Sequence, residues 1–204
     1  MHPAFRWRVS LKLFDMKTMA VTAGLMLLMT TAVIASSDDT IRYEPIGYFH
    51  TPYTPDTGAP RQGILRPDSL ATIVLNAEYG GDALDFLDWF EYIVVLYHFT
   101  LVSDWDAHVE PPEANHEHTF GVYSTRSPKR PNPIGFSIVK LERIAGDTLY
   151  LRGADAFDGT PVLDIKPYLP SVDMVKSLQN EMVEKELGHH DEDFIEKEDS
   201  VFYR

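Results

Sequence analysis

The segment best suited to bind an anion is a proline-rich basic stretch in the second half of the chain. Residues 126–135 read RSPKRPNPIG and carry Arg126, Lys129 and Arg130 among three prolines. Proline fixes φ and does not fit a central strand, so we expect a stiff loop here. A stiff loop holds guanidinium groups in place at little entropic cost, which suits carboxylate or phosphate recognition. The simpler interpretation is a basic surface loop.

Acidic residues gather in a second segment, GADAFDGTPVLDIKPY, at residues 153–168. Asp158 and the following glycine are typical of a hairpin turn, where acids often only cap the backbone. Asp164 and Lys166 lie two residues apart in a predicted short strand, so they share one face of it. This spacing predicts an ion pair or a site.

A metal site is a weaker hypothesis. It would use three histidines and three nearby glutamates of a predicted loop, His108, His116, His118, Glu110, Glu113 and Glu117. The loop contains two prolines and offers no fixed third ligand, so we expect no metal. His189 and His190 lie in an acidic tail and receive the same interpretation.

The elements that must position these residues are mostly short strands. Strands are expected at 43–53, 71–75, 92–99, 120–124, 136–144, 148–153 and 162–165, the third of them buried on both faces. Helices are expected at 82–90, with Asp82 as N-cap, and at 173–187, with one apolar face formed by Val175, Leu178, Met182 and Val183. This pattern predicts a mainly β, single-domain antiparallel β-barrel, or a strongly bent sheet, with one or two short helices.

Composition excludes several classes of site. The 204 residues include no cysteine, which rules out disulfides, thiolate zinc sites and a cysteine nucleophile. The net charge is −13, from 18 basic and 31 acidic residues, so the chain is not a generally basic nucleic-acid binder. Any RNA contact needs a local basic patch, for which Lys129 and Arg130 beside Arg126 are the candidates.

The first 35 residues have the features of an export signal or an N-terminal membrane anchor. Four basic residues precede a run without charge at residues 18–37, and cleavage after Ala35 fits the small residues there. A start at Met16 or Met19 would instead favour a cytoplasmic protein. We expect membrane contact only through residues 18–37. The expected organisation is a leader at 1–35, a barrel at 41–173, and a helix with an acidic tail at 174–204.

Two long motifs carry a resemblance to a known family. The runs GVYSTRSPKRPNPIGFSIVKLERI and GADAFDGTPVLDIKPYLP resemble the TsaA-like family, also called the YaeB or TrmO family. The resemblance spans roughly residues 41–173. It implies a small β-barrel, a homodimer, and methylation of the N6 of threonylcarbamoyladenosine beside the tRNA anticodon with S-adenosylmethionine.

Carried over by position, the resemblance implies a set of cofactor contacts: Gln62, Gly63, His98, Phe99, Arg126, Phe136, Arg152, Gly153, Ala154 and Asp155. Arg126 suits the carboxylate of the cofactor, main-chain groups at 153–154 suit the adenine edge, and Asp155 suits an amino or ribose hydroxyl group. A base is needed to remove the N6 proton, and the candidates are Asp158 and His98.

Two departures from the family pattern concern the RNA substrate more than the cofactor. Phe99 stands where the bacterial tRNA enzymes carry glutamine, and the chain ends in GHHDEDFIEKEDSVFYR where they carry a further domain. Two alternatives to tRNA methylation therefore stay open. One is an exported S-adenosylmethionine-binding protein, and the other is a methyltransferase acting on a small molecule.

Overall fold

The computed structural model describes residues 40–110 and 119–186, the side chains of 184–186 excepted. The chain divides into two units, residues 1–42 and 43–204, and the second contains every element below. The predicted leader, two of the candidate metal-binding histidines and the acidic tail lie outside the described residues. In the part of the chain that is described, no helix has the length and apolar character needed to cross a membrane.

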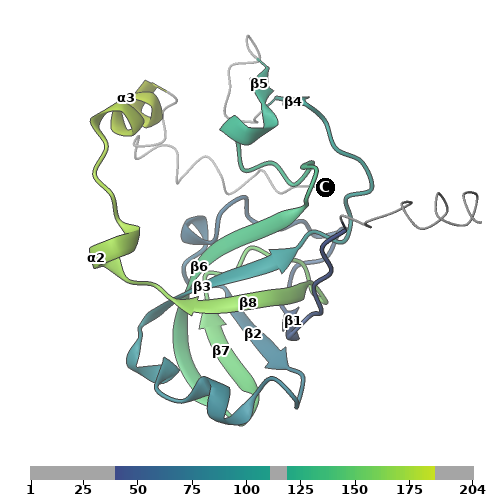
Figure 1. Cartoon of the computed structure of the whole chain (residues 1–204), viewed down its shortest axis with the longest axis vertical. Coiled ribbons are helices and arrows are strands. Elements are labelled where there is room, and N and C mark those ends of the chain that lie inside the picture. The colour runs from purple at the N-terminus through teal and green to yellow at the C-terminus, as the bar shows by residue number, and fades with distance from the viewer. Residues whose placement is uncertain (1–39, 111–118, 187–204) are drawn as a thin grey trace, which may run out of the picture. The chain divides into compact units, whose positions relative to one another are not determined.

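Six antiparallel strands close into a barrel in the order β1-β2-β7-β6-β3-β8 (Figure 1). Their bounds are β1 Gly47–His50, β2 Leu70–Leu75, β3 Tyr92–His98, β6 Ile134–Ala145, β7 Thr148–Arg152 and β8 Pro161–Pro167. The predicted mainly β barrel is therefore confirmed. The first strand is shorter than predicted because pairing with β2 ends at His50, after which the Thr51 amide bonds to Asp158 instead.

The barrel interior is filled by alternate residues of each strand. Phe49, Ile73, Ile93, Leu149 and Val162 are completely buried, and they come from five different strands. Along β6 the inward positions are 135, 137, 139 and 141, while Phe136 and Ile138 stay partly exposed on the outer face. In β3 three consecutive residues, 93–95, are buried, as the apolar run predicts. Burial of this interior is the main stabilising contribution to the fold.

The connections contain short 3-10 helices and a small ribbon. The 3-10 helices are η1 Gly63–Leu65, η2 Gly81–Leu84, η3 Leu87–Trp89 and η4 Val122–Ser124. The ribbon pairs β4 His108–Val109 with β5 Phe120–Gly121. The predicted strand at 120–124 is thus wrong beyond Gly121. There the Thr125 amide and hydroxyl both donate to the Val122 carbonyl and close a turn.

The predicted helix at 82–90 is wrong. Two 3-10 turns replace it, separated by Phe86 in a left-handed conformation with φ +64°, and Gly80 rather than Asp82 precedes the first turn. The apolar spacing was nevertheless informative, because Leu84 and Leu87 both pack against the core. Periodicity identified the buried residues, and the adjacent glycines Gly80 and Gly81 favour tight turns over a continuous helix.

The C-terminal helix begins later than predicted. A single turn, α2 Pro170–Asp173, is followed by a break, and then by α3 Leu178–Glu186. Ser177 provides the N-cap of α3, because its Oγ accepts a hydrogen bond of 3.3 Å from the Asn180 amide. The predicted apolar stripe is exposed, with Val175 80% and Leu178 75% accessible.

Candidate functional site

A network of polar groups at one end of the barrel is centred on the Asp155 carboxylate. Its Oδ1 accepts hydrogen bonds from the hydroxyl groups of Ser137 and Tyr97, the latter at 3.3 Å. Its Oδ2 accepts a bond of 3.1 Å from the Gly63 amide. The network joins β3, β6, η1 and the turn after β7. The two hydroxyl groups point inward, and their residues are only 3–5% exposed.

Burial raises the pKa of Asp155 to about 6, and the bonds from Ser137, Tyr97 and Gly63 oppose that shift. Burial, followed by the neighbouring charge of Asp155, raises the pKa of Tyr97 far above its ordinary value. Tyr97 is therefore a neutral donor at all working pH values. Asp155 is ionised at neutral pH, in the form that every one of these donors favours.

Two glycines allow the loops of the site to touch. A β-carbon on Gly63 would lie 1.8 Å from the carbonyl oxygen of Gly153, so no other residue fits there without displacing the backbone. Gly153 has φ +74°, which favours glycine, and its amide bonds to the Ser69 carbonyl at 3.0 Å. The close contact brings residues 62–63 and 153–155 together, as the resemblance implies.

Arg126 lies next to the same loop. Its Nη1 donates a hydrogen bond of 2.6 Å to Gln62 Oε1, and its guanidinium carbon is 5.8 Å from the centre of the Phe136 ring. Among the described residues no carboxylate pairs with Arg126. A positioned guanidinium without a carboxylate partner is suited to bind the carboxylate of a ligand.

His98 and Phe99 end the buried strand on opposite sides of it. The Phe99 ring contacts the Tyr97 ring edge to face, with centroids 5.2 Å apart, and packs against the core. His98 is paired with Ile134 across β3 and β6, two positions from the pair Leu96–Phe136. By strand alternation His98 and Phe136 lie on the same outer face. The structure therefore places His98 near Phe136 and Arg126.

Asp158 occupies a different position from His98, and no hydrogen bond or ion pair joins the two. Asp158 Oδ1 lies 3.4 Å from His50 Nδ1 and accepts a bond of 3.3 Å from the Thr51 amide. Both His50 and Asp158 are more than half exposed. The acidic turn is thus held against the end of β1.

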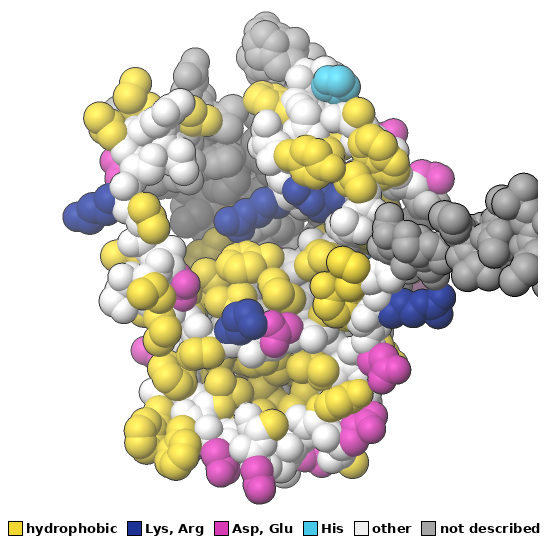
Figure 2. All heavy atoms as spheres, viewed as in Figure 1, with side chains coloured by type: hydrophobic (Ala, Val, Ile, Leu, Met, Phe, Trp, Pro, Cys, Tyr) yellow, Lys and Arg dark blue, Asp and Glu magenta, His cyan; other side chains and the backbone are white. Residues whose placement is uncertain are grey.

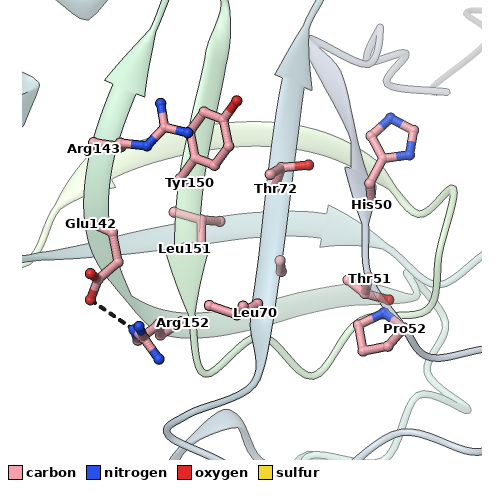
Figure 3. A pocket seen from close by; sticks show the side chains of 11 residues that line it. His50, Thr51, Pro52, Leu70, Thr72, Glu142, Arg143, Tyr150, Leu151 and Arg152 are labelled. Atoms are coloured by element: carbon pink, nitrogen blue, oxygen red, sulfur yellow. Dashed lines mark ion pairs between the residues drawn. The ribbon is translucent and has the colours of Figure 1, made fainter.

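Arg152 is not brought to the Asp155 network. Its side chain lies on the outer face of β7, in a hollow that extends over β1, β2, β7 and β6 (Figure 3). It pairs with Glu142 at 3.1 Å and approaches Asp68 at 3.8 Å. In the same hollow the Arg143 guanidinium stacks on the Tyr150 ring at 3.3 Å. The backbone of Arg152 adjoins the site, whereas its guanidinium group pairs with carboxylates outside the site.

The two predicted RNA contacts have different surroundings. Lys129 Nζ forms an exposed ion pair with Asp106 at 3.1 Å. Arg130 Nη1 donates to the carbonyl oxygens of Val122 at 3.1 Å and Thr125 at 2.8 Å, and it reaches Ser127 O at 3.5 Å. Arg130 therefore holds together the loop that carries Arg126. The predicted pair of Asp164 and Lys166 also forms.

Sequence reasoning missed Tyr97, Ser137 and His50. Tyr97 belongs to a strand that is almost entirely apolar, Ser137 lies near the start of another strand, and a lone hydroxyl in a strand is a weak signal. The available signal was a polar residue at an inward position. Ser137 lies on the same face of β6 as Gly135, Val139 and Leu141, all of which are buried. A hydroxyl at such a position needs a partner. For the metal hypothesis, no cluster of three potential ligands occurs among the described residues.

Comparison with known proteins shows similarity over most of the barrel. Residues 48–174 match the model of the tRNA-methyltransferase O N-terminal domain. An S-adenosyl-L-methionine-binding protein of Archaeoglobus fulgidus is 38% identical over 138 residues, which cover 68% of this chain and 96% of that protein. A tRNA (adenine(37)-N6)-methyltransferase of Mus musculus is 39% identical over 66% of this chain.

Solved structures agree. TrmO from Pseudomonas aeruginosa matches with a TM-score of 0.57 at 35% identity, over 69% of this chain and 62% of that one. The chain spans 32% of the length of the mouse methyltransferase and 77% of a probable S-adenosyl-L-methionine-binding protein of Pyrococcus abyssi, which is 38% identical. The similarity therefore concerns the barrel and its site.

Proposed function

The chain belongs to the tRNA-methyltransferase O family, and from this membership and the site we propose that it is an S-adenosylmethionine-dependent methyltransferase acting on tRNA. The observation that carries the proposal is the continuous chain of contacts from Asp155 through Gly63 and Gln62 to Arg126. These residues come from three separate stretches of the sequence, and the fold brings them to one end of the barrel.

The residues present fit S-adenosylmethionine. Arg126 offers N–H donors for its carboxylate, and the Asp155 carboxylate, beside the Gly63 amide, would accept from an ammonium or ribose hydroxyl group. The backbone at 153–154, next to the close contact of Gly63 with Gly153, would contact the adenine edge. Phe136, 44% exposed, offers an aromatic face for a cation. When bound, the cofactor supplies an electrophilic methyl group on a sulfonium.

We assign the role of general base to His98 rather than Asp158. His98 lies on the face of Phe136 and Arg126, and a neutral imidazole can take a proton from the acceptor nitrogen. Asp158 is already engaged by His50 and the Thr51 amide, which suits a role in holding the turn. Arg126, Gln62 and Phe136 would orient the reactants, which supplies much of the barrier reduction in such a transfer.

For the acceptor we propose the N6 of adenosine 37 of tRNA, in its threonylcarbamoyl form. The support is the relative named for adenine(37)-N6 methylation, together with the motifs of the resemblance. The RNA would approach the loop of Arg126 and Lys129, because this loop presents basic side chains in a chain of net charge −13.

The test is transfer of a labelled methyl group from S-adenosylmethionine to threonine tRNA, with and without the threonylcarbamoyl group, by the full-length chain. We expect transfer to the modified tRNA. A bacterial family member should methylate the same tRNA in parallel. Binding of the cofactor without transfer to either tRNA would overturn the proposed acceptor and favour a small-molecule methyltransferase or a binding protein.

We also propose that the protein acts as a homodimer. Hydrophobic side chains gather over β3, β6 and β8 (Figure 2), where Ile134 is 43% and Ile138 39% exposed. Such a patch is typical of an interaction surface, and self-association would cover it. Sedimentation of the wild type and of Ile138→Lys tests this: the variant should be monomeric, and a monomeric wild type would contradict it.

A further inference from the structure

We propose that Tyr97 and Ser137 are positioning residues of the cofactor site: their hydroxyl groups fix the Asp155 carboxylate, and Asp155 in turn holds the loop of Gln62 that orients Arg126. Both hydroxyl groups bond to Asp155, and we assign their effect on the cofactor to that carboxylate. The functional part of this inference rests on the proposed cofactor site. The positioning itself rests on contacts within the barrel.

The acceptor positions of Asp155 show how the carboxylate is used. A carboxylate oxygen accepts about two hydrogen bonds, so the Ser137 and Tyr97 hydroxyl groups fill Oδ1. Ser137 has one hydrogen and lies closer to Asp155 than to the Tyr97 oxygen, which is 3.3 Å away, so it donates to Asp155. Oδ2 takes the Gly63 amide, and the amide of Asp155 itself also donates to the carboxylate. The two hydroxyl groups thus fix the orientation of the carboxylate, so that Oδ2 faces the loop of Gly63.

The position of Arg126 depends on this carboxylate through two hydrogen bonds. Asp155 Oδ2 holds the Gly63 amide at 3.1 Å, and the preceding residue, Gln62, receives Arg126 Nη1 at 2.6 Å. The Gln62 amide nitrogen donates to the Arg61 carbonyl at 2.8 Å, which fixes its orientation. If Asp155 rotated, the anchor of the loop would be lost and Gln62 would no longer hold the guanidinium in one place.

The barrel wall has room for this arrangement because residue 135 is glycine. A β-carbon on Gly135 would lie 2.2 Å from the Tyr97 ring, so any larger residue would displace the ring and its hydroxyl. On its other sides the ring meets Phe49 and Phe99 edge to face, at 5.6 and 5.2 Å. The ring is therefore fixed by packing, and its hydroxyl is presented to Asp155 with little conformational freedom.

The protonation state of Asp155 reports on this positioning. The groups facing the carboxylate are the Ser137 hydroxyl, the amide of Asp155 itself, the neutral Tyr97 hydroxyl and the Gly63 amide, and the nearest cation in the chain of contacts is Arg126. All four groups donate, so each stabilises the ionised form against the cost of burial. Removing either hydroxyl should raise the pKa of Asp155 further.

The experiment compares Tyr97→Phe and Ser137→Ala with wild type in the full-length chain. The first readout is the titration of the Asp155 carboxyl carbon by NMR without ligand, where both variants should titrate at higher pH than wild type. The second is S-adenosylmethionine affinity at pH 7.5, which each variant should weaken by about tenfold, as expected for one bond to a charged group.

The matched control is Tyr53→Phe. It removes a hydroxyl bond of 2.7 Å from Tyr53 to Ser69, outside the Asp155 network. This variant should leave the titration and the affinity unchanged. An unchanged Asp155 titration in Tyr97→Phe and Ser137→Ala would overturn the positioning role. If wild type does not bind the cofactor, the proposed function fails, and the titration still decides whether the two hydroxyl groups hold Asp155.

Discussion

At the residue scale, Arg126 is the side chain on which cofactor recognition depends most directly. It is exposed and touches Gln62 and Phe136, and none of the described carboxylates neutralises it. Arg126→Ala should weaken S-adenosylmethionine binding by about 1–2 kcal/mol, the range for a hydrogen-bonded charge that water partly screens. Calorimetry measures this, with Arg143→Ala as the control, because Arg143 stacks on Tyr150 outside the site. Equal affinities of Arg126→Ala and wild type would remove Arg126 from the site.

Asp155 should make the stability of the protein depend on pH in an unusual direction. Its pKa is about 6 in the folded chain against an ordinary 3.8, so between these values the folded state binds more protons than the unfolded state. Stability attributable to Asp155 therefore falls as pH rises toward 6, by about 3 kcal/mol, and stays lowered above it. The carboxylate is thus kept at a cost to the fold, as is common at functional sites.

The variant Asp155→Asn cannot ionise and isolates this contribution. Its stability relative to wild type should increase between pH 5 and 7.5, measured by urea unfolding at several pH values. The difference between the two proteins removes the contributions of all other titrating groups. Parallel stability curves for the two proteins would show that the Asp155 pKa is not raised.

The loop residues of the candidate site were predictable from the sequence, whereas the inward-facing strand residues were not. Gln62, Gly63, Arg126 and Asp155 stand in motifs that identify them, and the structure brings them together. Arg152 directly precedes the second motif, yet strand alternation turns its side chain outward to Glu142. Ser137 lies in the first motif and Tyr97 in the third predicted strand, but their role follows from a barrel closure that pairs β3 with β6. Sequence spacing alone does not contain that pairing.

At the scale of elements, the loop between β5 and β6 is held in shape by Arg130. This guanidinium bonds to carbonyl groups of Val122 and Thr125, so it replaces the regular pairing that the prolines prevent. Arg130→Ala should leave those carbonyls without a partner and loosen the loop that carries Arg126. We expect weaker cofactor binding, by about 1 kcal/mol, as well as less RNA methylation.

Lys129→Ala is the matched comparison for Arg130→Ala. Lys129 pairs with Asp106 at the surface, and exposed pairs of this kind contribute little to stability. This variant should keep cofactor affinity and lose only RNA-dependent activity. Calorimetry with S-adenosylmethionine and a methyl-transfer assay on the two variants test this. Equal cofactor affinities in both variants would contradict the structural role of Arg130.

The predicted elements differ from the observed ones where local geometry overrides apolar spacing. Strand positions followed from alternation because each strand has one face in the barrel. The region at 82–90 kept its leucines against the core, where they are partly buried, but not its helix, since Gly81 and Phe86 adopt positive φ. The start of the last helix moved to Ser177 because a serine cap, rather than apolar spacing, fixes where a helix begins.

At the scale of the whole molecule, the basic run and uncharged segment at residues 6–37 predict association with a membrane or envelope fraction. We expect the full-length chain to fractionate there, and a chain without residues 1–37 to leave that fraction, because the basic residues and the uncharged run are then both missing. Immunoblotting of cell fractions with a C-terminal tag measures this. Full-length protein found wholly in the soluble fraction would contradict the leader.

The overall charge sets how RNA can bind. With 31 acidic and 18 basic residues the chain repels phosphate in general, so contact should be confined to a few cations near Arg126. Two or three neutralised phosphates give a shallow dependence on salt, with a slope of about −2 for the logarithm of the association constant.

Asp106→Asn removes the partner of Lys129, which should free that ammonium, strengthen tRNA binding and steepen the slope by about one. Glu91→Gln, which loosens the remote pair with Lys140, is the control and should leave the slope unchanged. Filter binding of threonine tRNA at salt concentrations from about 50 to 200 mM measures these slopes. Identical slopes for Asp106→Asn and wild type would show that the RNA does not dock at Lys129.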